Sequence, residues 1–180
     1  MKENTIYTYG FKNQLVKAEN YLKNGGDVDV LGEYDSSALH YACREGNIEM
    51  IQLLLRYGAN VNKKNRYSTI YPIFDILSST KIMEPLLFIQ LLLKNGASVT
   101  VVDSFGNNIL HYAVEQEDMA LVKFCIQSGC DINYTDRHDQ DTPLHYAYFQ
   151  KNREIINYLV EQGADRKRLN IYNKMPESYL

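Results

Sequence analysis

The chain has little of several features that mark particular classes of protein. Its three cysteines are an odd number and contain no CxxC pair, so neither a disulfide framework nor a paired-cysteine metal motif is indicated. The longest apolar stretch, residues 85–93, is interrupted by Gln90 and is far shorter than the roughly 20 residues that span a bilayer. The 19 basic and 22 acidic residues leave a net charge of only −3, which gives no indication of the basic face that binds nucleic acid.

The first 25 residues also lack the apolar segment of a signal peptide. Without an export signal, reduced thiols in a cytosol are the expected state. We therefore expect a cytoplasmic protein, of a bacterium or, for a viral or secreted effector, of a host cell. The remaining composition is ordinary: the 180 residues are 45% hydrophobic and 23% charged, so they can form one domain that folds without a metal or a disulfide.

What the chain does have is an internal repeat. Segments that begin at Leu39, Leu110 and Leu144 share the letters Leu-His-Tyr-Ala, and the last two begin 34 residues apart. A less obvious copy places Ile73 at the leucine position. One glycine closes each copy, and these glycines are Gly25, Gly58, Gly96, Gly129 and Gly163. The step from Gly58 to Gly96 is the long one, which predicts an insertion of about four residues around 78–85.

Each copy reads as two short helices. In the second copy the first helix is expected over 39–45, and a Gly-Asn pair breaks it. A second helix is expected to begin near Ile48, with Ile48, Ile51, Leu54 and Leu55 on one face. Gly58 ends that helix as a left-handed C-terminal residue would. One such pair cannot bury its own apolar stripes, so the copies are expected to stack.

These residues resemble the ankyrin repeat, which has a period of about 33 residues and a Thr-Pro-Leu-His-x-Ala helix start. Residues 142–147 match that start fully, and residues 37–42 and 108–113 match it in part. The resemblance implies an all-α solenoid of about five stacked helix pairs with hairpin tips, in a single domain over 1–180. The expected repeats are 1–32 as an N-terminal cap, 33–65, 66–102 with the insertion, 103–136, 137–169 and a partial repeat at 170–180.

Residues that could suggest chemistry fall at fixed repeat positions. His40, His111 and His145 share one position, so they lie in different repeats, and the resemblance implies that each ring hydrogen-bonds nearby backbone. The cysteines, Cys43, Cys125 and Cys130, are expected to pack as small hydrophobes. The acidic run 131–141 lacks the glycine and the final glutamate of a calcium loop. We therefore expect no catalytic residue, no metal and no cofactor.

The resemblance also implies where a partner would bind. Variable positions in this family lie before the Thr-Pro-Leu-His start and at the end of the first helix. By repeat position, the expected partner-binding residues are Glu33, Tyr34, Arg44, Glu45, Tyr67, Ile70, Phe105, Asn107, Glu115, His138, Asp139, Asp141 and Phe149. Four of these are aromatic and several are acidic, so we expect a basic or polar partner surface that contains apolar pockets.

The sequence thus predicts a non-catalytic protein–protein interaction module that binds through a concave face and its hairpin tips and is monomeric when free. No nucleic acid or membrane partner is expected. An alternative is an inhibitor or immunity-type protein that blocks another protein's active site. An enzyme with a site on the concave face is the third possibility, and no acid–base pair outside the repeat positions supports it.

Overall fold

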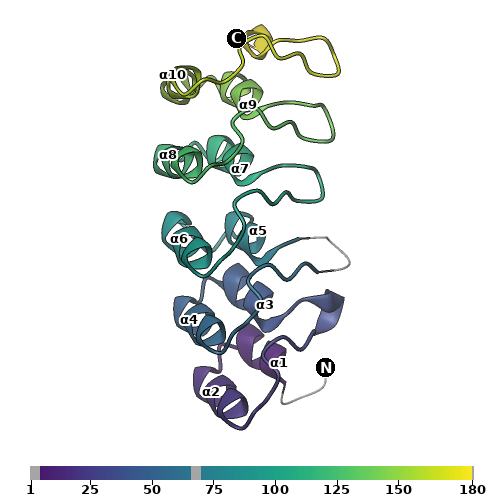
Figure 1. The fold of residues 1–180 in the computed structure, drawn as a ribbon, viewed down its shortest axis with the longest axis vertical. Coiled ribbons are helices and arrows are strands. Elements are labelled where there is room, and N and C mark those ends of the chain that lie inside the picture. The colour runs from purple at the N-terminus through teal and green to yellow at the C-terminus, as the bar shows by residue number, and fades with distance from the viewer. Residues whose placement is uncertain (1–4, 66–69, 180) are drawn as a thin grey trace. The chain divides into compact units, whose positions relative to one another are not determined.

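The computed structural model describes residues 5–65 and 70–179, without the side chain of Glu33. Over these ranges the regular structure consists of ten α-helices, two short 3₁₀-helices and one isolated antiparallel bridge between Leu31 and Ser37. The helices follow one another in pairs, and a hairpin loop leads from each pair to the next (Figure 1). The predicted all-α fold of repeated helix pairs is confirmed. Among the described residues, none of the helices has the length and hydropathy needed to traverse a bilayer.

The chain divides into two compact units, which we call the N-terminal unit (1–98) and the C-terminal unit (99–180). The N-terminal unit contains α1 (Ile6–Phe11), α2 (Leu15–Lys23), the 3₁₀-helix η1 (Glu33–Asp35), α3 (Ala38–Glu45), α4 (Ile48–Arg56), α5 (Pro72–Leu77) and α6 (Leu86–Lys94). The first helices pack in order, α1 on α3 and α3 on α5. Leu39, Ile51 and Leu54 are completely buried, as the helical spacing of their apolar neighbours predicts.

The short turn between the two helices of a pair has a local cause. Gly46 ends α3 in the left-handed region, at φ +67°, where a residue without a Cβ is favoured. The side chain of Asn47 then accepts a hydrogen bond from the backbone N–H of Met50 and caps α4. Asp118 and Asn152 cap the second helices of the last two pairs in the same way.

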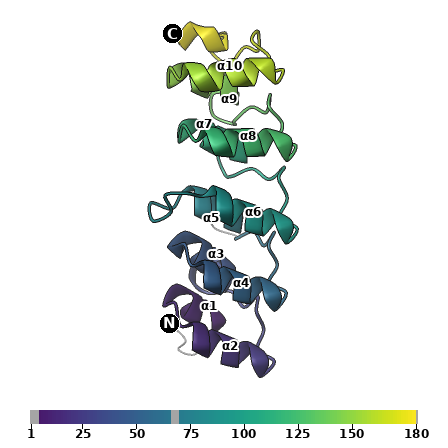
Figure 2. The ribbon, with the colours of Figure 1, turned by 90° about the vertical axis from the view of Figure 1, so that its left-hand side faces the viewer.

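The connection between α5 and α6 is longer than the others. It covers residues 78–85 and extends as a loop beyond the helix pair (Figure 2). Pro85 occupies the N-cap of α6 at φ −69°, so the proline lies at the start of the helix and not within it. Ser79 donates a hydrogen bond to the carbonyl of Arg44 over 2.7 Å, and Lys81 pairs with Glu45. The predicted insertion therefore folds back onto the end of α3.

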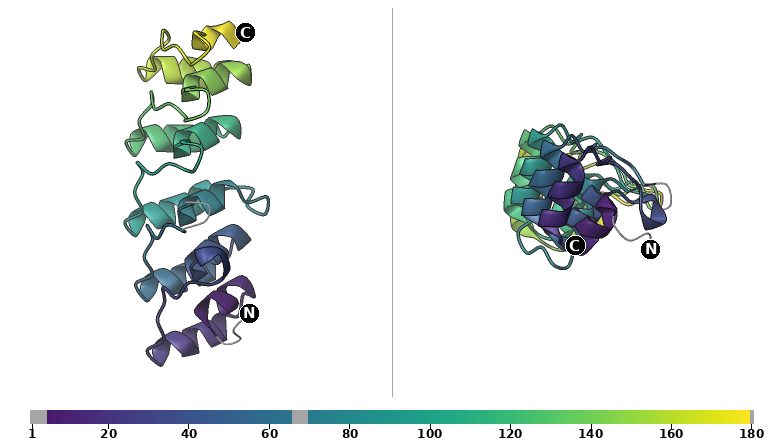
Figure 3. Two further views of the ribbon diagram at one scale, coloured as in Figure 1. Left: turned by 90° about the vertical axis from the view of Figure 1, so that its right-hand side faces the viewer. Right: turned by 90° about the horizontal axis from the view of Figure 1, so that it is seen from below.

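The C-terminal unit contains α7 (Ile109–Glu115), α8 (Met119–Gln127), α9 (Pro143–Phe149), α10 (Arg153–Glu161) and the 3₁₀-helix η2 (Pro176–Tyr179). Its helix pairs form successive layers (Figure 3). In this unit α7 packs on α9 and α9 packs on η2. The short η2 occupies the place of the predicted partial repeat. The hairpin loops of this unit, which we call fingers, leave the helices on one side (Figure 1).

Candidate functional site

A buried aspartate shapes each of two fingers in the C-terminal unit. Asp103 Oδ1 accepts hydrogen bonds from the backbone N–H groups of Phe105 and Asn107, over 2.9 and 2.8 Å. Asp136 Oδ1 accepts from the N–H groups of three consecutive finger residues, 138–140, over 2.8–3.1 Å. Because the carboxylates replace missing backbone partners, the finger residues are held in one conformation. The sequence analysis did not identify this role, although a buried Asp or Asn recurs at the equivalent position of four hairpin loops, at Asn65, Asp103, Asp136 and Asn170.

Two tyrosines tie these fingers to the first helices. The Tyr112 hydroxyl donates to Asp103 Oδ2 over 2.8 Å, and the Tyr146 hydroxyl lies 3.1 Å from both Asp136 Oδ2 and Asn107 Oδ1. Burial raises the pKa of both phenols, and the neighbouring carboxylates raise it further. These two tyrosines therefore anchor the fingers to the helices.

Neighbouring fingers of this unit are joined through their backbones. Arg137 N–H donates to the carbonyl of Phe105 over 2.7 Å, and Ile171 N–H donates to the carbonyl of Asp139 over 2.9 Å. The first contact needs a glycine, because Gly106 has φ +86° and a Cβ there would lie 2.8 Å from the Arg137 nitrogen. The fingers therefore form a continuous, preorganised surface within the unit.

The repeated histidines lie at the base of this surface. Nδ1 of His111 accepts from the Asn108 N–H over 3.2 Å, and its Nε2 lies 3.2 Å from the carbonyl of Asp141. His145 makes the equivalent contacts with Thr142 and with the carbonyl of Lys174. Burial lowers the pKa of His111 to about 4. The resemblance described above predicts such hydrogen bonds between the histidine rings and nearby backbone.

Two of the predicted aromatic residues are strongly exposed in the C-terminal unit. Phe105 lies in a finger and is 65% exposed, and Phe149 ends α9 and is 70% exposed. Glu115 and His138 are exposed on the same unit, at the end of α7 and in a finger. Phenylalanine side chains are usually buried, so the exposure of Phe105 and Phe149 on a preorganised surface distinguishes these two positions.

A hollow of about 240 Å³ lies beside Phe149. Its lining residues come from one finger, α9 and η2, and they are Asp139, Asp141, His145, Tyr146, Phe149 and Tyr179. The ring of Phe149 meets that of Tyr179 edge to face, with centroids 6.1 Å apart. Three of the six residues were predicted from the repeat position. Tyr179 was not predicted, because the sequence indicated only an incomplete helix there.

Both carboxylates of the hollow have polar neighbours. Asp141 Oδ1 accepts from the Asn170 amide over 2.7 Å, and its pKa is raised, mainly by burial. Asp139 Oδ1 accepts from the Tyr172 hydroxyl over 3.0 Å and lies 2.9 Å from Nδ1 of His138. The hollow therefore combines two acidic groups with aromatic walls.

The predicted binding residues of the N-terminal unit are arranged differently. Tyr34 is 71% exposed, and Ile70 is half-buried, with its carbonyl 3.2 Å from Nε2 of His40. Glu45 pairs with Lys81 of the insertion. Tyr67 and the side chain of Glu33 lie outside the described residues.

Arg44 makes an ion pair that the sequence analysis missed. Its Nε and Nη2 donate to Asp75 Oδ1 over 3.0 and 2.7 Å. Asp75 is buried, and its Oδ2 has no hydrogen-bond partner. Burial raises the pKa of this carboxyl to about 6, although Arg44 opposes the rise. Asp75 occupies the repeat position that holds Tyr41, Tyr112 and Tyr146 in other repeats, so no hydroxyl anchor forms here.

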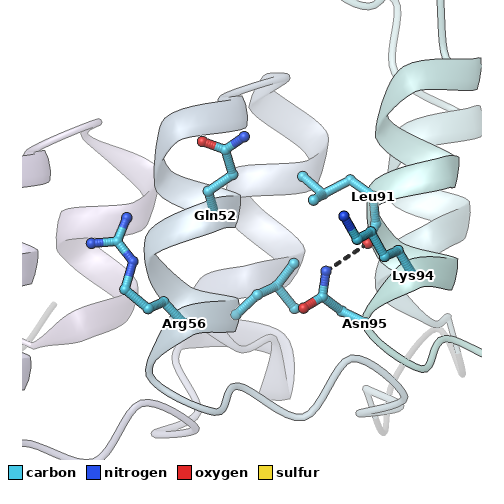
Figure 4. Close-up of a pocket in the computed structure, with 6 residues that line it drawn as sticks. Gln52, Arg56, Leu91, Lys94 and Asn95 are labelled. Atoms are coloured by element: carbon cyan, nitrogen blue, oxygen red, sulfur yellow. Dashed lines mark hydrogen bonds between the residues drawn. The ribbon is translucent and has the colours of Figure 1, made fainter.

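A second hollow, of about 340 Å³, lies between α4 and α6 (Figure 4). Its lining residues are Gln52, Leu55, Arg56, Leu91, Lys94 and Asn95. The Asn95 amide donates to the carbonyl of Leu91 over 2.8 Å. The other lining side chains are two cations, two leucines and one glutamine. This hollow belongs to the second helices, where the sequence predicted no binding residue.

The described residues contain no group of three or more His, Cys, Asp or Glu side chains that could hold a metal ion. The three cysteines are buried and free. Burial raises the pKa of Cys43, and contact with Cys130 together with burial raises that of Cys125. A raised pKa disfavours the thiolate that nucleophilic catalysis needs.

Comparison with known proteins agrees with the repeat geometry. Residues 81–170 match the family description "Ankyrin repeats (3 copies)", and residues 34–66 match "Ankyrin repeat". A Fowlpox virus (strain NVSL) ankyrin repeat protein, FPV244, is 32% identical over 133 residues, which cover 61% of this chain and 20% of the viral protein. The human transient receptor potential cation channel subfamily A member 1 is 30% identical over 135 residues, or 71% of this chain and 12% of the channel.

The human ankyrin repeat and SOCS box protein 6 is 29% identical over 155 residues, which cover 76% of this chain and 35% of that protein. The chain therefore spans about a third or less of the length of each of these relatives. Because the three-copy match alone covers half of the sequence, the chain belongs to the ankyrin-repeat family.

Proposed function

We propose that the chain is a non-catalytic module that binds a partner protein through the fingers and first helices of its C-terminal unit. Ankyrin repeats are in general protein–protein interaction modules. The observation that supports this choice of surface is the exposure of Phe105 and of Phe149, which lines a hollow together with Asp139 and Asp141. Aromatic anchors surrounded by polar residues are typical of binding hot spots.

The rigidity of the fingers adds to this argument. Asp103 and Asp136 hold the finger backbones, and the Arg137–Phe105 hydrogen bond joins one finger to the next. Little conformational entropy is then lost when a partner binds, so more of the contact energy appears as affinity.

The charges indicate what kind of partner fits. Asp139 and Asp141 are partly exposed and line the hollow beside Phe149. Glu115 is exposed at the end of α7 in the same unit. A partner surface with basic side chains and apolar pockets complements them, and its association rate should fall as salt is added.

The test is affinity capture of the partner from the native cell, with identification by mass spectrometry, followed by binding measurements on variants. The double variant Phe105→Ala/Phe149→Ala should weaken binding by more than about 30-fold, since one anchor can contribute about 2 kcal/mol or more. Its melting temperature should change little, because both side chains are exposed. Leu87→Ala is the control, since Leu87 is 58% exposed on α6 of the other unit.

Normal binding by the double variant would refute the proposed surface. A loss with Leu87→Ala instead would move the interface to the second helices. Adding the purified chain to the captured partner then separates the two uses predicted from the sequence: loss of the partner's own activity identifies an inhibitor, and unchanged activity identifies an adaptor.

A further inference from the structure

The hollow beside Phe149 has the composition of a site for a single cationic side chain. Its volume of about 240 Å³ is below the roughly 300–1,000 Å³ of pockets that hold whole small molecules. The walls are the rings of Tyr146, Phe149 and Tyr179, and the acids are Asp139 and Asp141. Aromatic faces attract cations through their quadrupole, and carboxylates do so through their charge.

The chain does not neutralise these acids itself. Among the described residues, no Lys or Arg forms an ion pair with Asp139 or Asp141. The groups that face them are the Asn170 amide, the Tyr172 hydroxyl and the rings of His138 and His145. Two acidic side chains therefore line an aromatic-walled hollow without a Lys or Arg ion-pair partner among the described residues.

One ring of the hollow already accepts a cation. The Lys174 ammonium lies over Tyr179, 5.2 Å from the ring centroid. This contact shows that the aromatic wall is electrostatically suited to a positive group, while Lys174 makes no ion pair with either carboxylate. A second cation, from outside the chain, would meet both the rings and the acids.

We infer that this hollow binds an arginine side chain of the partner protein, an inference that rests on the proposed function. Arginine fits better than lysine for a geometric reason. Its guanidinium is planar, so it can stack on an aromatic face such as Phe149 while it donates to two carboxylates. Lysine offers a compact, strongly hydrated charge that gains less from a stacked site.

The ionisation of Asp141 agrees with this occupant. Its raised pKa reports a carboxylate whose charge is disfavoured by burial and not fully compensated. A bound guanidinium would stabilise the charged form. The pKa of Asp141 should therefore fall when the hollow is occupied.

The experiment is an NMR titration of the full chain with the peptide acetyl-Gly-Gly-Arg-Gly-Gly-amide. We expect saturable amide shifts confined to residues 138–149 and 170–179, with millimolar affinity, and a lower pKa of the Asp141 carboxyl in the bound state. The citrulline peptide, which keeps the shape without the charge, should give no saturable shifts. The lysine peptide should bind at least about threefold more weakly than the arginine peptide.

The variants Asp141→Asn and Phe149→Ala should each weaken arginine-peptide binding at least about fivefold, which corresponds to about 1 kcal/mol. The matched control is Glu161→Gln, which removes the same charge from an exposed position on α10 and should bind normally. The amide spectrum of each variant shows whether it is folded. Asparagine keeps the acceptor oxygen used by Asn170, so Asp141→Asn should retain the fold.

Equal shifts from the citrulline peptide, equal affinity for lysine, or an equal loss with Glu161→Gln would each overturn the arginine site. So would saturable shifts located on other helices. If these results appear while Phe105→Ala/Phe149→Ala still loses the captured partner, the binding surface stands and only its occupant is wrong. If the peptide binds as expected but the double variant captures the partner normally, the hollow is a cation site outside the partner interface.

Discussion

Replacing His111 with alanine tests how the fingers are joined to the helices. The ring is 1% exposed. It bridges the Asn108 N–H and the Asp141 carbonyl. In the variant the buried Asn108 N–H has no replacement partner, while water can reach the half-buried Asp141. We therefore expect a loss of stability and no direct effect on a partner.

The contacts set the size of the loss. A buried donor left without a partner costs about 1–3 kcal/mol. The edge-to-face contact of His111 with Tyr146, at a centroid distance of 5.2 Å, contributes about 1 kcal/mol more. The variant should therefore be about 2–4 kcal/mol less stable than the wild type near pH 7.5.

The pH dependence gives a sharper test. The pKa of His111 is about 4 in the folded chain and 6.5 ordinarily, so folding favours the neutral ring. The stability associated with this ring is complete above pH 6.5 and is lost as the pH falls toward 4. The variant lacks the ring and escapes that loss. Its deficit relative to the wild type should therefore shrink, by about 2 kcal/mol between pH 7.5 and pH 5.

Urea unfolding followed by circular dichroism at the two pH values measures this difference. His138→Ala is the control, because the exposed His138 ring hydrogen-bonds Asp139, and the His138 backbone N–H that donates to Asp136 Oδ1 is kept in the variant; it should change stability by less than about 0.5 kcal/mol. A deficit of His111→Ala that does not vary with pH would refute the reasoning about burial. Unchanged stability with lost partner binding would refute the structural role altogether.

Two further sets of variants test the fold. Gly106→Ala should cost about 2–3 kcal/mol by thermal unfolding, because its Cβ would meet Arg137 at a positive φ, whereas Gly129→Ala, with φ +88° and nothing within 4 Å, should cost about 1 kcal/mol; equal costs would contradict the close approach. The pKa of Asp75 is about 6 against an ordinary 3.8, so its contribution to stability is complete below pH 3.8 and is lost as the pH rises through 6. Asp75→Asn should therefore be more stable than the wild type at pH 8, by about 2–3 kcal/mol, with little difference near pH 4; a difference that is constant with pH would refute the buried charge. Arg44→Ala should lower stability at pH 8 by about 2 kcal/mol, since it leaves that charge unpaired, and by less at pH 5, where Asp75 is largely protonated; an equal loss at both would contradict the ion pair.

Much of the helical framework was predictable because its signals are local. The left-handed glycine at 46, the Asn47 cap and the apolar spacing of α4 lie within about ten residues of one another. Each acts through contacts inside one helix or turn, so the amino-acid sequence of that segment is sufficient to place the helix. The long step between Gly58 and Gly96 located the insertion, and the structure shows that the helix after it begins next to Pro85.

The candidate site was predictable only as a set of positions. The repeat position identified Asp139, Asp141 and Phe149, and it predicted exposure for Phe105. It did not identify Tyr179, because that residue follows an incomplete repeat with no copy to compare. It also did not show that Asp139 and Tyr179 border the same hollow.

The sequence by itself determined the repeat period, the helix pairs and the histidines that join helix to finger, because each of these is written within one repeat. The tertiary structure alone decided which side chains of adjacent repeats meet. Arg44 reaches the buried Asp75, and the Tyr146 hydroxyl reaches Asn107 as well as Asp136. The partners Arg44 and Asp75 are about one repeat apart in sequence, and whether they touch depends on side-chain reach and burial across the packed layers, which no local pattern encodes.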